Sequence, residues 1–139
     1  MTREEIFAFM NANPACFLAT VENDQPRVRG VLLYKASEEG IIFHTGKMKS
    51  LYNQLQASPK AEFCFVKDGV QLRVAGELKL IEDKNLKIEI SNHPSRAFMK
   101  SFGDNFNLDQ LAVYKMTNGK ATYWTLKRNF EPTLYAELV

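Results

Sequence analysis

The chain has 139 residues, of which 45% are hydrophobic and 24% are charged, and its formal net charge is +2. This balance is typical of a soluble globular protein, and the length suits a single domain spanning residues 1–139. Such a small net charge gives no general attraction to nucleic acid or to anionic lipid, so we expect neither as a partner. Any anion that the protein binds must therefore be held by a local cluster of cations.

The first third of the chain predicts one helix followed by three strands. Thr2 and Glu5 have the spacing of a helix capping box, and Asn13-Pro14 ends the helix. Apolar strands are expected at 16–21, 27–35 and 41–45, separated by turns at 23–26 and 37–40. The N-terminus lacks the features of a signal peptide, and no apolar run has the length of a membrane span. We therefore expect a cytoplasmic protein.

The rest of the chain continues with helices and hairpins. A helix is expected at 48–57, then a hairpin of strands 61–66 and 70–80 around Asp68-Gly69, then helical segments at 84–90 and 96–102. Asn118-Gly119 predicts a last hairpin of strands 110–117 and 120–126, and the tail from Lys127 should be irregular or an arm. The predicted fold class is α+β, mainly antiparallel β, with two or three peripheral helices around a barrel.

Metal and hydrolase sites have no support in the sequence. Cys16 and Cys64 lie in apolar runs, which favours buried, reduced thiols, and they are too far apart for a Cys-x-x-Cys pair. The Gly-x-Ser-x-Gly and His-Glu-x-x-His motifs are both absent. We therefore predict no metal site and name no catalytic residue.

A pair of arginines marks the first segment that can hold a ligand. Arg27 and Arg29 have the i, i+2 spacing that places both guanidinium groups on one face of a strand. Burying two unpaired cations is costly, so this face either lies in solvent or meets an anionic or polar ligand. For the two arginines alone, exposure to solvent is the more frequent outcome.

The second segment is the predicted strand-to-helix junction that runs from His44 to Ser50 and contains Thr45, Lys47 and Lys49. Hydroxyl groups and lysines at a helix N-terminus can cradle a phosphate, because free backbone N–H groups and the helix dipole attract an anion there. An ordinary helix cap with solvated lysines fits the same residues equally well.

Two further candidates lie on later strands. Gln71 shares a strand face with Arg73, and its amide can bond the edge of a planar ring, although such a residue more often pairs across the sheet. Trp124 is the only tryptophan, and it is either a core or interface residue or a residue stacked near a cofactor. His93, which precedes Pro94, is assigned no role.

Taken in order, these segments resemble the pyridoxamine 5′-phosphate oxidase superfamily of FMN-binding split β-barrels. The resemblance covers residues 5 to 124 and rests on the order and spacing of Phe17-Leu18-Ala19-Thr20-Val21, Pro26-Arg27-Val28-Arg29-Gly30-Val31-Leu32-Leu33, Phe43-His44-Thr45, Leu55-Gln56-Ala57-Ser58-Pro59 and Gln71-Leu72-Arg73-Val74-Ala75-Gly76. The Pro-Arg-Val-Arg and Thr-Gly-Lys-x-Lys-Ser-Leu-Tyr patterns resemble the subgroup of general-stress and nitroimidazole-resistance-like proteins.

This resemblance implies a homodimer with FMN bound at the subunit interface. It implies that Arg29, Val31 and Leu32 line the flavin and that Thr45, Lys49 and Ser50 lie on its phosphate side. It further implies that Gln71 reaches the ring from the partner subunit. With the residues taken from the patterns above, the candidate cofactor-binding residues are Arg27, Arg29, Val31, Leu32, His44, Thr45, Lys47, Lys49, Ser50, Gln71 and Trp124.

The chain departs from the true oxidases at three places. Tyr34 replaces a lysine that contacts the vitamin phosphate, Lys49-Ser50-Leu51 replaces a Ser-Arg-Lys cluster, and the C-terminal arginine-rich signature is missing. These departures argue against pyridoxamine-phosphate oxidation and leave FMN binding intact. We expect a flavin-dependent oxidoreductase that takes electrons from NAD(P)H or another donor and acts on an unidentified small molecule.

The alternative is a non-catalytic protein that binds flavin or haem, or that senses redox state. A haem would need an axial ligand, and His44 and His93 are the only imidazoles in the sequence.

Overall fold

The computed structural model describes every residue from Met1 to Val139. In chain order the elements are α1 (Arg3–Ala12), β1 (Ala15–Glu22), β2 (Gln25–Leu32), β3 (Lys35–Ser37), β4 (Gly40–Gly46), α2 (Ser50–Ala57), β5 (Lys60–Lys67), β6 (Val70–Glu77), β7 (Lys79–Ile81), α3 (Lys84–Asn92), the 3-10 segments η1 (Pro94–Asn105) and η2 (Leu108–Gln110), β8 (Leu111–Met116), β9 (Lys120–Trp124), the 3-10 segment η3 (Leu126–Arg128) and β10 (Ala136–Glu137).

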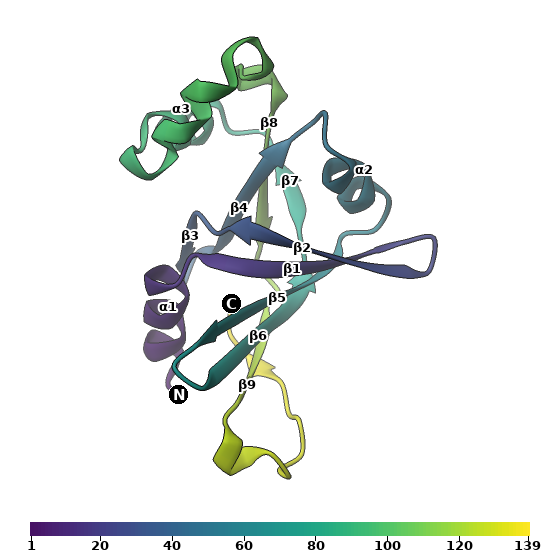
Figure 1. Ribbon diagram of the computed structural model, residues 1–139, viewed down its shortest axis with the longest axis vertical. Helices are drawn as coiled ribbons and strands as arrows, with labels where there is room; N and C mark the ends of the chain where they lie inside the picture. The colour runs from purple at the N-terminus through teal and green to yellow at the C-terminus, as the bar shows by residue number, and fades with distance from the viewer.

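Two antiparallel sheets make up the body of the protein (Figure 1). The larger sheet has the order β10-β9-β6-β5-β1-β2, and the smaller has the order β3-β4-β8-β7. One apolar cluster of 21 buried residues joins them, and within it Phe63 of β5 packs edge-on against Phe43 of β4. The predicted class, α+β with mainly antiparallel strands, is confirmed.

Both predicted turns in the larger sheet are tight hairpins. Asn23 and Asp24 join β1 to β2, Asp68 and Gly69 join β5 to β6, and all four residues have positive φ angles. Positive φ at both central positions is the mark of a type I′ turn, whose twist matches that of the strands it connects. These turns fix the register of the β1–β2 and β5–β6 pairs.

The N-terminal helix begins and ends where the sequence predicts. Both hydrogen bonds of the Thr2–Glu5 capping box are present, and Asn13 is the C-cap. The Asn11 side chain bonds both the N–H and the carbonyl of Ala36, at 2.9 and 2.8 Å, and so fastens α1 to β3.

Two strands that the apolar pattern predicts as continuous are divided where the chain passes from one sheet to the other. The expected strand 27–35 breaks at Leu33, whose N–H donates to the Pro14 carbonyl before β3 begins. The expected strand 70–80 breaks at Leu78, whose N–H donates to the Pro59 carbonyl before β7 begins. Both leucines are buried, so the apolar pattern runs unbroken through each crossing.

The hairpin predicted at Asn118-Gly119 is wrong. Strand β8 pairs with β4 and β7, whereas β9 pairs with β6 and β10, so this dipeptide links the two sheets. The Asn118 side chain accepts a hydrogen bond from the Glu77 N–H at 2.9 Å, and the Gly119 carbonyl accepts from the Leu138 and Val139 N–H groups. Long-range hydrogen bonds therefore override the local preference of Asn-Gly for a type I′ turn.

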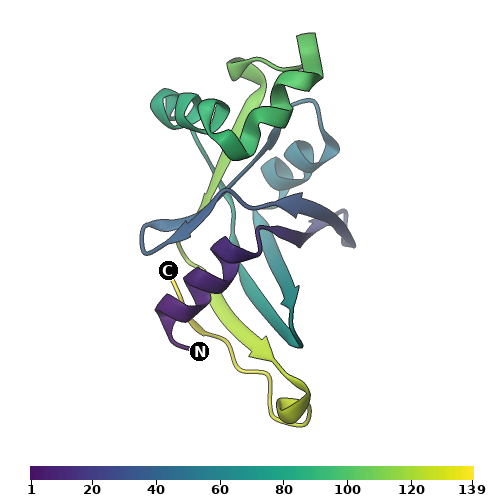
Figure 2. The same cartoon turned by 60° about the vertical axis from the view of Figure 1, so that its left-hand side comes forward.

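The tail from Lys127 is an irregular arm only in part. Residues 125–135 project from the end of β9 as a loop (Figure 2), but Ala136–Glu137 returns to pair with β9 as the edge strand β10. Leu138 then enters the core, and its carbonyl accepts a hydrogen bond from Arg3 Nε at 2.7 Å. The C-terminus is thus tied to α1.

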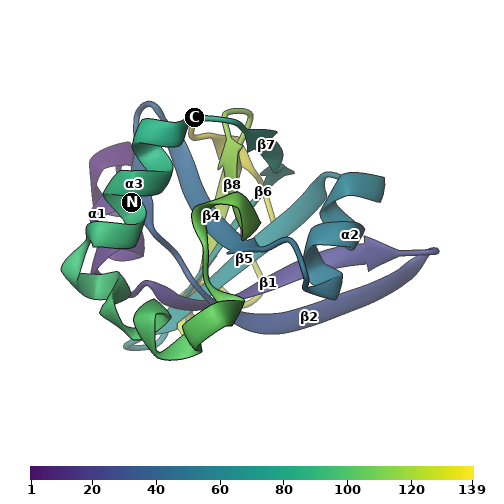
Figure 3. The ribbon, with the colours of Figure 1, turned by 90° about the horizontal axis from the view of Figure 1, so that it is seen from above.

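Helical segments flank strand β4 at one end of the molecule. Seen from above, α2 lies to one side of β4, while α3 and η1 lie to the other (Figure 3). No helix in the structure combines the length and the apolar character needed to cross a membrane.

Candidate functional site

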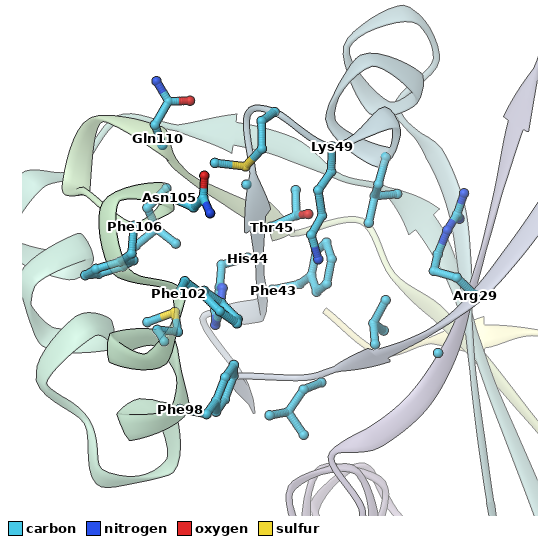
Figure 4. Close-up of a pocket in the computed structure, with 18 of the residues that line it drawn as sticks. Arg29, Phe43, His44, Thr45, Lys49, Phe98, Phe102, Asn105, Phe106 and Gln110 are labelled. Carbon is cyan, nitrogen blue, oxygen red and sulfur yellow. The ribbon is translucent and has the colours of Figure 1, made fainter.

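A cavity of about 1130 Å³ lies between β2, the junction of β4 with α2, and the segments η1 and η2. Figure 4 shows Phe43, His44 and Thr45 of β4 at its centre, Arg29 to one side and the rings of η1 to the other. The candidate residues that line the cavity are Arg29, Val31, Leu32, His44, Thr45, Lys49 and Ser50.

The charges in this cavity are all positive. Arg29 and Lys49 are the only charged side chains in its lining, no Asp or Glu contributes to it, and neither cation forms an ion pair. Both come from the side of the cavity formed by β2 and the start of α2. That side therefore favours an anionic ligand.

The N-terminus of α2 is open to a ligand. Lys49 is the N-cap residue, and its side chain forms no capping hydrogen bond. The first N–H groups of α2 consequently lack a capping side chain, and the helix dipole adds positive potential at the same point. Together with the Lys49 ammonium and the hydroxyls of Thr45 and Ser50, these groups form a site suited to a phosphate.

Arg29 is held by bonds to the elements beside it. One guanidinium nitrogen donates to the Leu18 carbonyl at 3.0 Å and to Thr20 Oγ1 at 2.8 Å, and the other donates to Gln54 Oε1. The Thr20 hydroxyl also donates to Gln54 Oε1, at 2.7 Å. Since Thr20 and Gln54 are both buried, this network fastens α2 to β1 and β2.

His44 projects from β4 and pairs with a buried arginine. Its Nε2 accepts a hydrogen bond from Arg96 Nε at 2.7 Å, which requires the neutral imidazole with its proton on Nδ1. Burial, reinforced by the charges of Arg96 and Lys49, lowers the pKa of His44 to about 4. The side chain is therefore uncharged at neutral pH.

Arg96 joins η1 to the strands beneath it. It is 2% exposed, donates to the Leu33 carbonyl at 2.8 Å and lies over the ring of Tyr34. No carboxylate pairs with it, so its charge is balanced by carbonyl, imidazole and ring contacts and by a hydrogen bond to the Ser95 hydroxyl at 2.9 Å. The sequence carries no signal for this role, because all of these partners except Ser95 are distant in the chain.

An aromatic wall on the η1 side is the part of the cavity that sequence reasoning missed. Phe98, Phe102 and Phe106 line the cavity, and the Asn105 amide lies beside them, whereas the amide of Gln110, which also belongs to the lining, points away from the rings (Figure 4). The three rings recur every four residues, a spacing typical of one helix face, and this was the available signal. We name residues Phe98–Gln110 that line the cavity the η1 wall.

Four candidate residues lie outside the cavity. Arg27 is exposed and pairs with Glu22 at 3.2 Å, and Lys47 does not reach the lining. Gln71 and Trp124 are paired in the register of β6 and β9, on the face of the larger sheet opposite to its core. Within a single chain, therefore, none of these four side chains reaches the cavity.

Tyr34 also points away from the cavity. Its hydroxyl donates to a Glu89 carboxylate oxygen at 2.7 Å, and its ring packs edge-on against His93. Burial and the Glu89 hydrogen bond raise the pKa of Tyr34 to about 12. The position at which the true oxidases carry a lysine thus supplies no cation to the site.

The family model of pyridoxamine 5′-phosphate oxidase matches residues 2–125. The chain belongs to this family. A pyridoxine/pyridoxamine 5′-phosphate oxidase from Wolbachia pipientis wMel is 37% identical over 73 residues, a match that spans 50% of this chain and about a third (34%) of that protein.

Two solved structures share the whole fold. A NimC/NimA family protein from Clostridium acetobutylicum superposes with a TM-score of 0.76 at 24% identity, covering 98% of this chain and 93% of that one. A pyridoxamine 5′-phosphate oxidase-related, FMN-binding protein from Nostoc punctiforme PCC 73102 superposes with a TM-score of 0.67 at 18% identity, covering 96% and 88%. The split-barrel fold and the superfamily that the resemblance implies are confirmed.

The site offers little to a metal or a haem iron. The structure contains no group of three or more His, Cys, Asp or Glu side chains that could hold a metal ion. His44 is the one histidine in the cavity lining, and its Nε2 is already engaged by Arg96. His93 is exposed and bonds Ser95.

Proposed function

We propose that the protein binds FMN in this cavity and acts as a flavin-dependent oxidoreductase on a small molecule. The observation that carries the proposal is the separation of charge within the cavity. Its two cations and an uncapped helix N-terminus line one part of it, and the apolar side chains of Val31, Leu32 and Phe43 line the part next to them. FMN has the same division, with a phosphate at one end and a flat ring system at the other.

The residues present fit the cofactor. Lys49, Ser50 and Thr45 would hold the phosphate, while Val31, Leu32 and Phe43 would contact its apolar part. When bound, flavin supplies reversible hydride and single-electron transfer, and the protein contributes binding, orientation and restricted access. The uncharged His44 and the fixed Arg29 add no acid or base that the reaction would depend on.

Oxidation of pyridoxamine phosphate is not the activity that we propose. A second phosphate would need cations of its own, and the cavity has only Arg29 and Lys49. Tyr34 lies outside it, bound to Glu89. We therefore propose a different small molecule as the substrate.

We further propose that two copies of the chain associate through the outer face of the larger sheet. Phe17, Val28 and Val66 share this face and are 54%, 70% and 56% exposed. Exposed apolar side chains gathered on one sheet face mark an interaction surface. Phe17 also lines the cavity, so the cavity reaches the edge of the same face.

This association would give Gln71 and Trp124 a place in the site. Val66 lies opposite Gln71, and Gln71 lies opposite Trp124, so all three occupy the outer face. Both candidate residues are remote from the cavity of their own chain. A second copy seated on this face would present them to the neighbouring cavity, which agrees with the role implied for Gln71.

Spectroscopy of the purified protein tests the proposal. We expect flavin absorption bands, a rise in melting temperature on addition of FMN, and bleaching of the flavin by NADH or NADPH. Binding of FMN without reduction by any donor would favour the non-catalytic alternative. A haem spectrum, or no response to FMN at all, would overturn the proposal.

A further inference from the structure

We infer that the η1 wall is a second ligand site, beside the cofactor site, for an uncharged planar aromatic compound. This inference rests on the proposed FMN function, since it assigns what the remainder of the cavity holds. The cavity volume of about 1130 Å³ exceeds the roughly 300–1,000 Å³ of most small-molecule sites. It therefore has room for a ligand in addition to the cofactor.

The rings of the η1 wall are arranged to receive another ring. Phe98 and Phe102 form an edge-to-face pair, with centroids 5.9 Å apart and planes at 70°. They nevertheless remain 46% and 49% exposed. Aromatic rings pair favourably in edge-to-face and offset-stacked geometry, so a planar ligand would cover apolar surface that now faces the cavity.

The wall is held in place by bonds to the strands. Arg96 ties the start of η1 to His44 and to the Leu33 carbonyl, at 2.7 and 2.8 Å. Further along, Gly103 has φ 59° and ψ −130°, a backbone conformation that favours glycine. The chain reverses there, which brings Phe106 to the same cavity as Phe102.

No charged side chain belongs to the η1 wall. Lys100 and Asp104 are exposed and outside the cavity lining, and Arg96 is buried outside that lining. The polar groups of the wall are amides, those of Asn105, Asn107 and Gln110. An anionic ligand would find no partner cation here, whereas a neutral ring bearing a polar substituent would find hydrogen-bonding partners.

The charge requirement can be tested with two ligands of the same shape, 2-naphthamide and 2-naphthoate. Each is titrated into FMN-loaded protein and followed by isothermal calorimetry. We expect the neutral amide to bind about ten-fold tighter or more than the carboxylate. Equal binding, or tighter binding of the carboxylate, would overturn the inference.

Two sets of variants test the position of the site. The double variant Phe98→Ala, Phe102→Ala should bind 2-naphthamide about ten-fold more weakly. The control Ile88→Ala, on the exposed face of the adjacent α3, should leave the affinity unchanged. Phe102→Lys should instead tighten 2-naphthoate, a gain that misfolding cannot produce. An unchanged affinity in the double alanine variant and no gain in the lysine variant would place the ligand elsewhere. If the wild-type protein does not bind FMN at all, the proposed function itself is contradicted.

Discussion

At the scale of single residues, the environment of a side chain decides its chemistry more than its type does. Arg27 and Arg29 are two positions apart on one strand, yet Arg27 is exposed and ion-paired while Arg29 is anchored by Thr20 and Gln54. Lys47 and Lys49 differ in the same way, because only Lys49 lines the cavity. Of the four cationic candidates in the sequence, only Arg29 and Lys49 line the cavity.

The phosphate assignment predicts which ligand a charge change affects. Lys49→Glu should weaken the binding of FMN by about ten-fold or more, because it places a carboxylate where the phosphate binds. It should weaken the binding of riboflavin, which has no phosphate, much less. Lys47→Glu makes the same charge change outside the cavity and is the matched control. The measurement is fluorescence titration of both ligands, and equal losses for FMN and riboflavin would remove the phosphate from this position.

His44 predicts a specific dependence of stability on pH. Its pKa is lowered to about 4 in the folded chain, against 6.5 for the free side chain. Between these values the unfolded chain binds more protons, so stability falls as pH decreases from 6.5 to 4 and this contribution then ceases to change. The loss is on the order of 3 kcal/mol, taking 1.36 kcal/mol per unit of pKa.

This contribution is measured as a difference between two proteins. Melting temperatures of the wild type and of His44→Gln, which keeps a hydrogen-bond acceptor for Arg96, are compared from pH 4 to pH 7. The wild type should lose stability more steeply as pH decreases. Parallel curves would mean that His44 is protonated as readily in the folded chain as in the unfolded one.

At the scale of elements, helix α2 connects the core to the phosphate site. Gln54 lies in the second turn of α2, is 7% exposed and accepts hydrogen bonds from Thr20 and Arg29. The same helix presents its N-terminus to the cavity. The position of that N-terminus therefore depends on a network that does not touch the ligand.

Gln54→Leu tests this connection. Loss of the acceptor leaves the buried Thr20 hydroxyl without its partner and removes one acceptor from the half-buried Arg29 guanidinium, at a cost of about 1–3 kcal/mol in unfolding free energy. FMN should be weakened several-fold more than riboflavin, because the displaced helix carries the phosphate site. Asn53→Leu, at an exposed position on the same helix, is the control, and chemical denaturation with ligand titration supplies both readouts. If Gln54→Leu destabilises the protein but leaves FMN binding unchanged, α2 is not the element that positions the phosphate.

At the scale of the whole molecule, the exposed face of the larger sheet predicts the oligomeric state. Val66 lies on this face near the turn between β5 and β6, is 56% exposed and does not line the cavity. Val66→Asp should convert a dimer of the 15.9 kDa chain into a monomer, because a carboxylate would be buried in the interface. Light scattering after size-exclusion chromatography measures the mass, and Ile88→Asp on α3 serves as control. A monomeric wild type would contradict the association that we propose.

Local signals in the sequence were sufficient for α1, for the hairpin turn at Asp68-Gly69, for the presence of a turn after β1 and for the order of the elements around the cavity. These depend on residues close together in the chain, such as Thr2 with Glu5 and Asp68 with Gly69. The same is true of the β4–α2 junction, which is why Thr45, Lys49 and Ser50 could be named as candidates from their pattern.

The tertiary structure alone decided where the chain changes sheets and which side chains meet in the site. At Leu33 and Leu78 the apolar pattern is continuous through each crossing, and at Asn118-Gly119 distant hydrogen bonds replace the local turn. The pairing of His44 with Arg96 likewise joins residues from separate segments, and it ties the segment that carries the η1 wall to β4. Contacts of this kind depend on packing and on long-range hydrogen bonds, and neither leaves a periodic trace in the sequence.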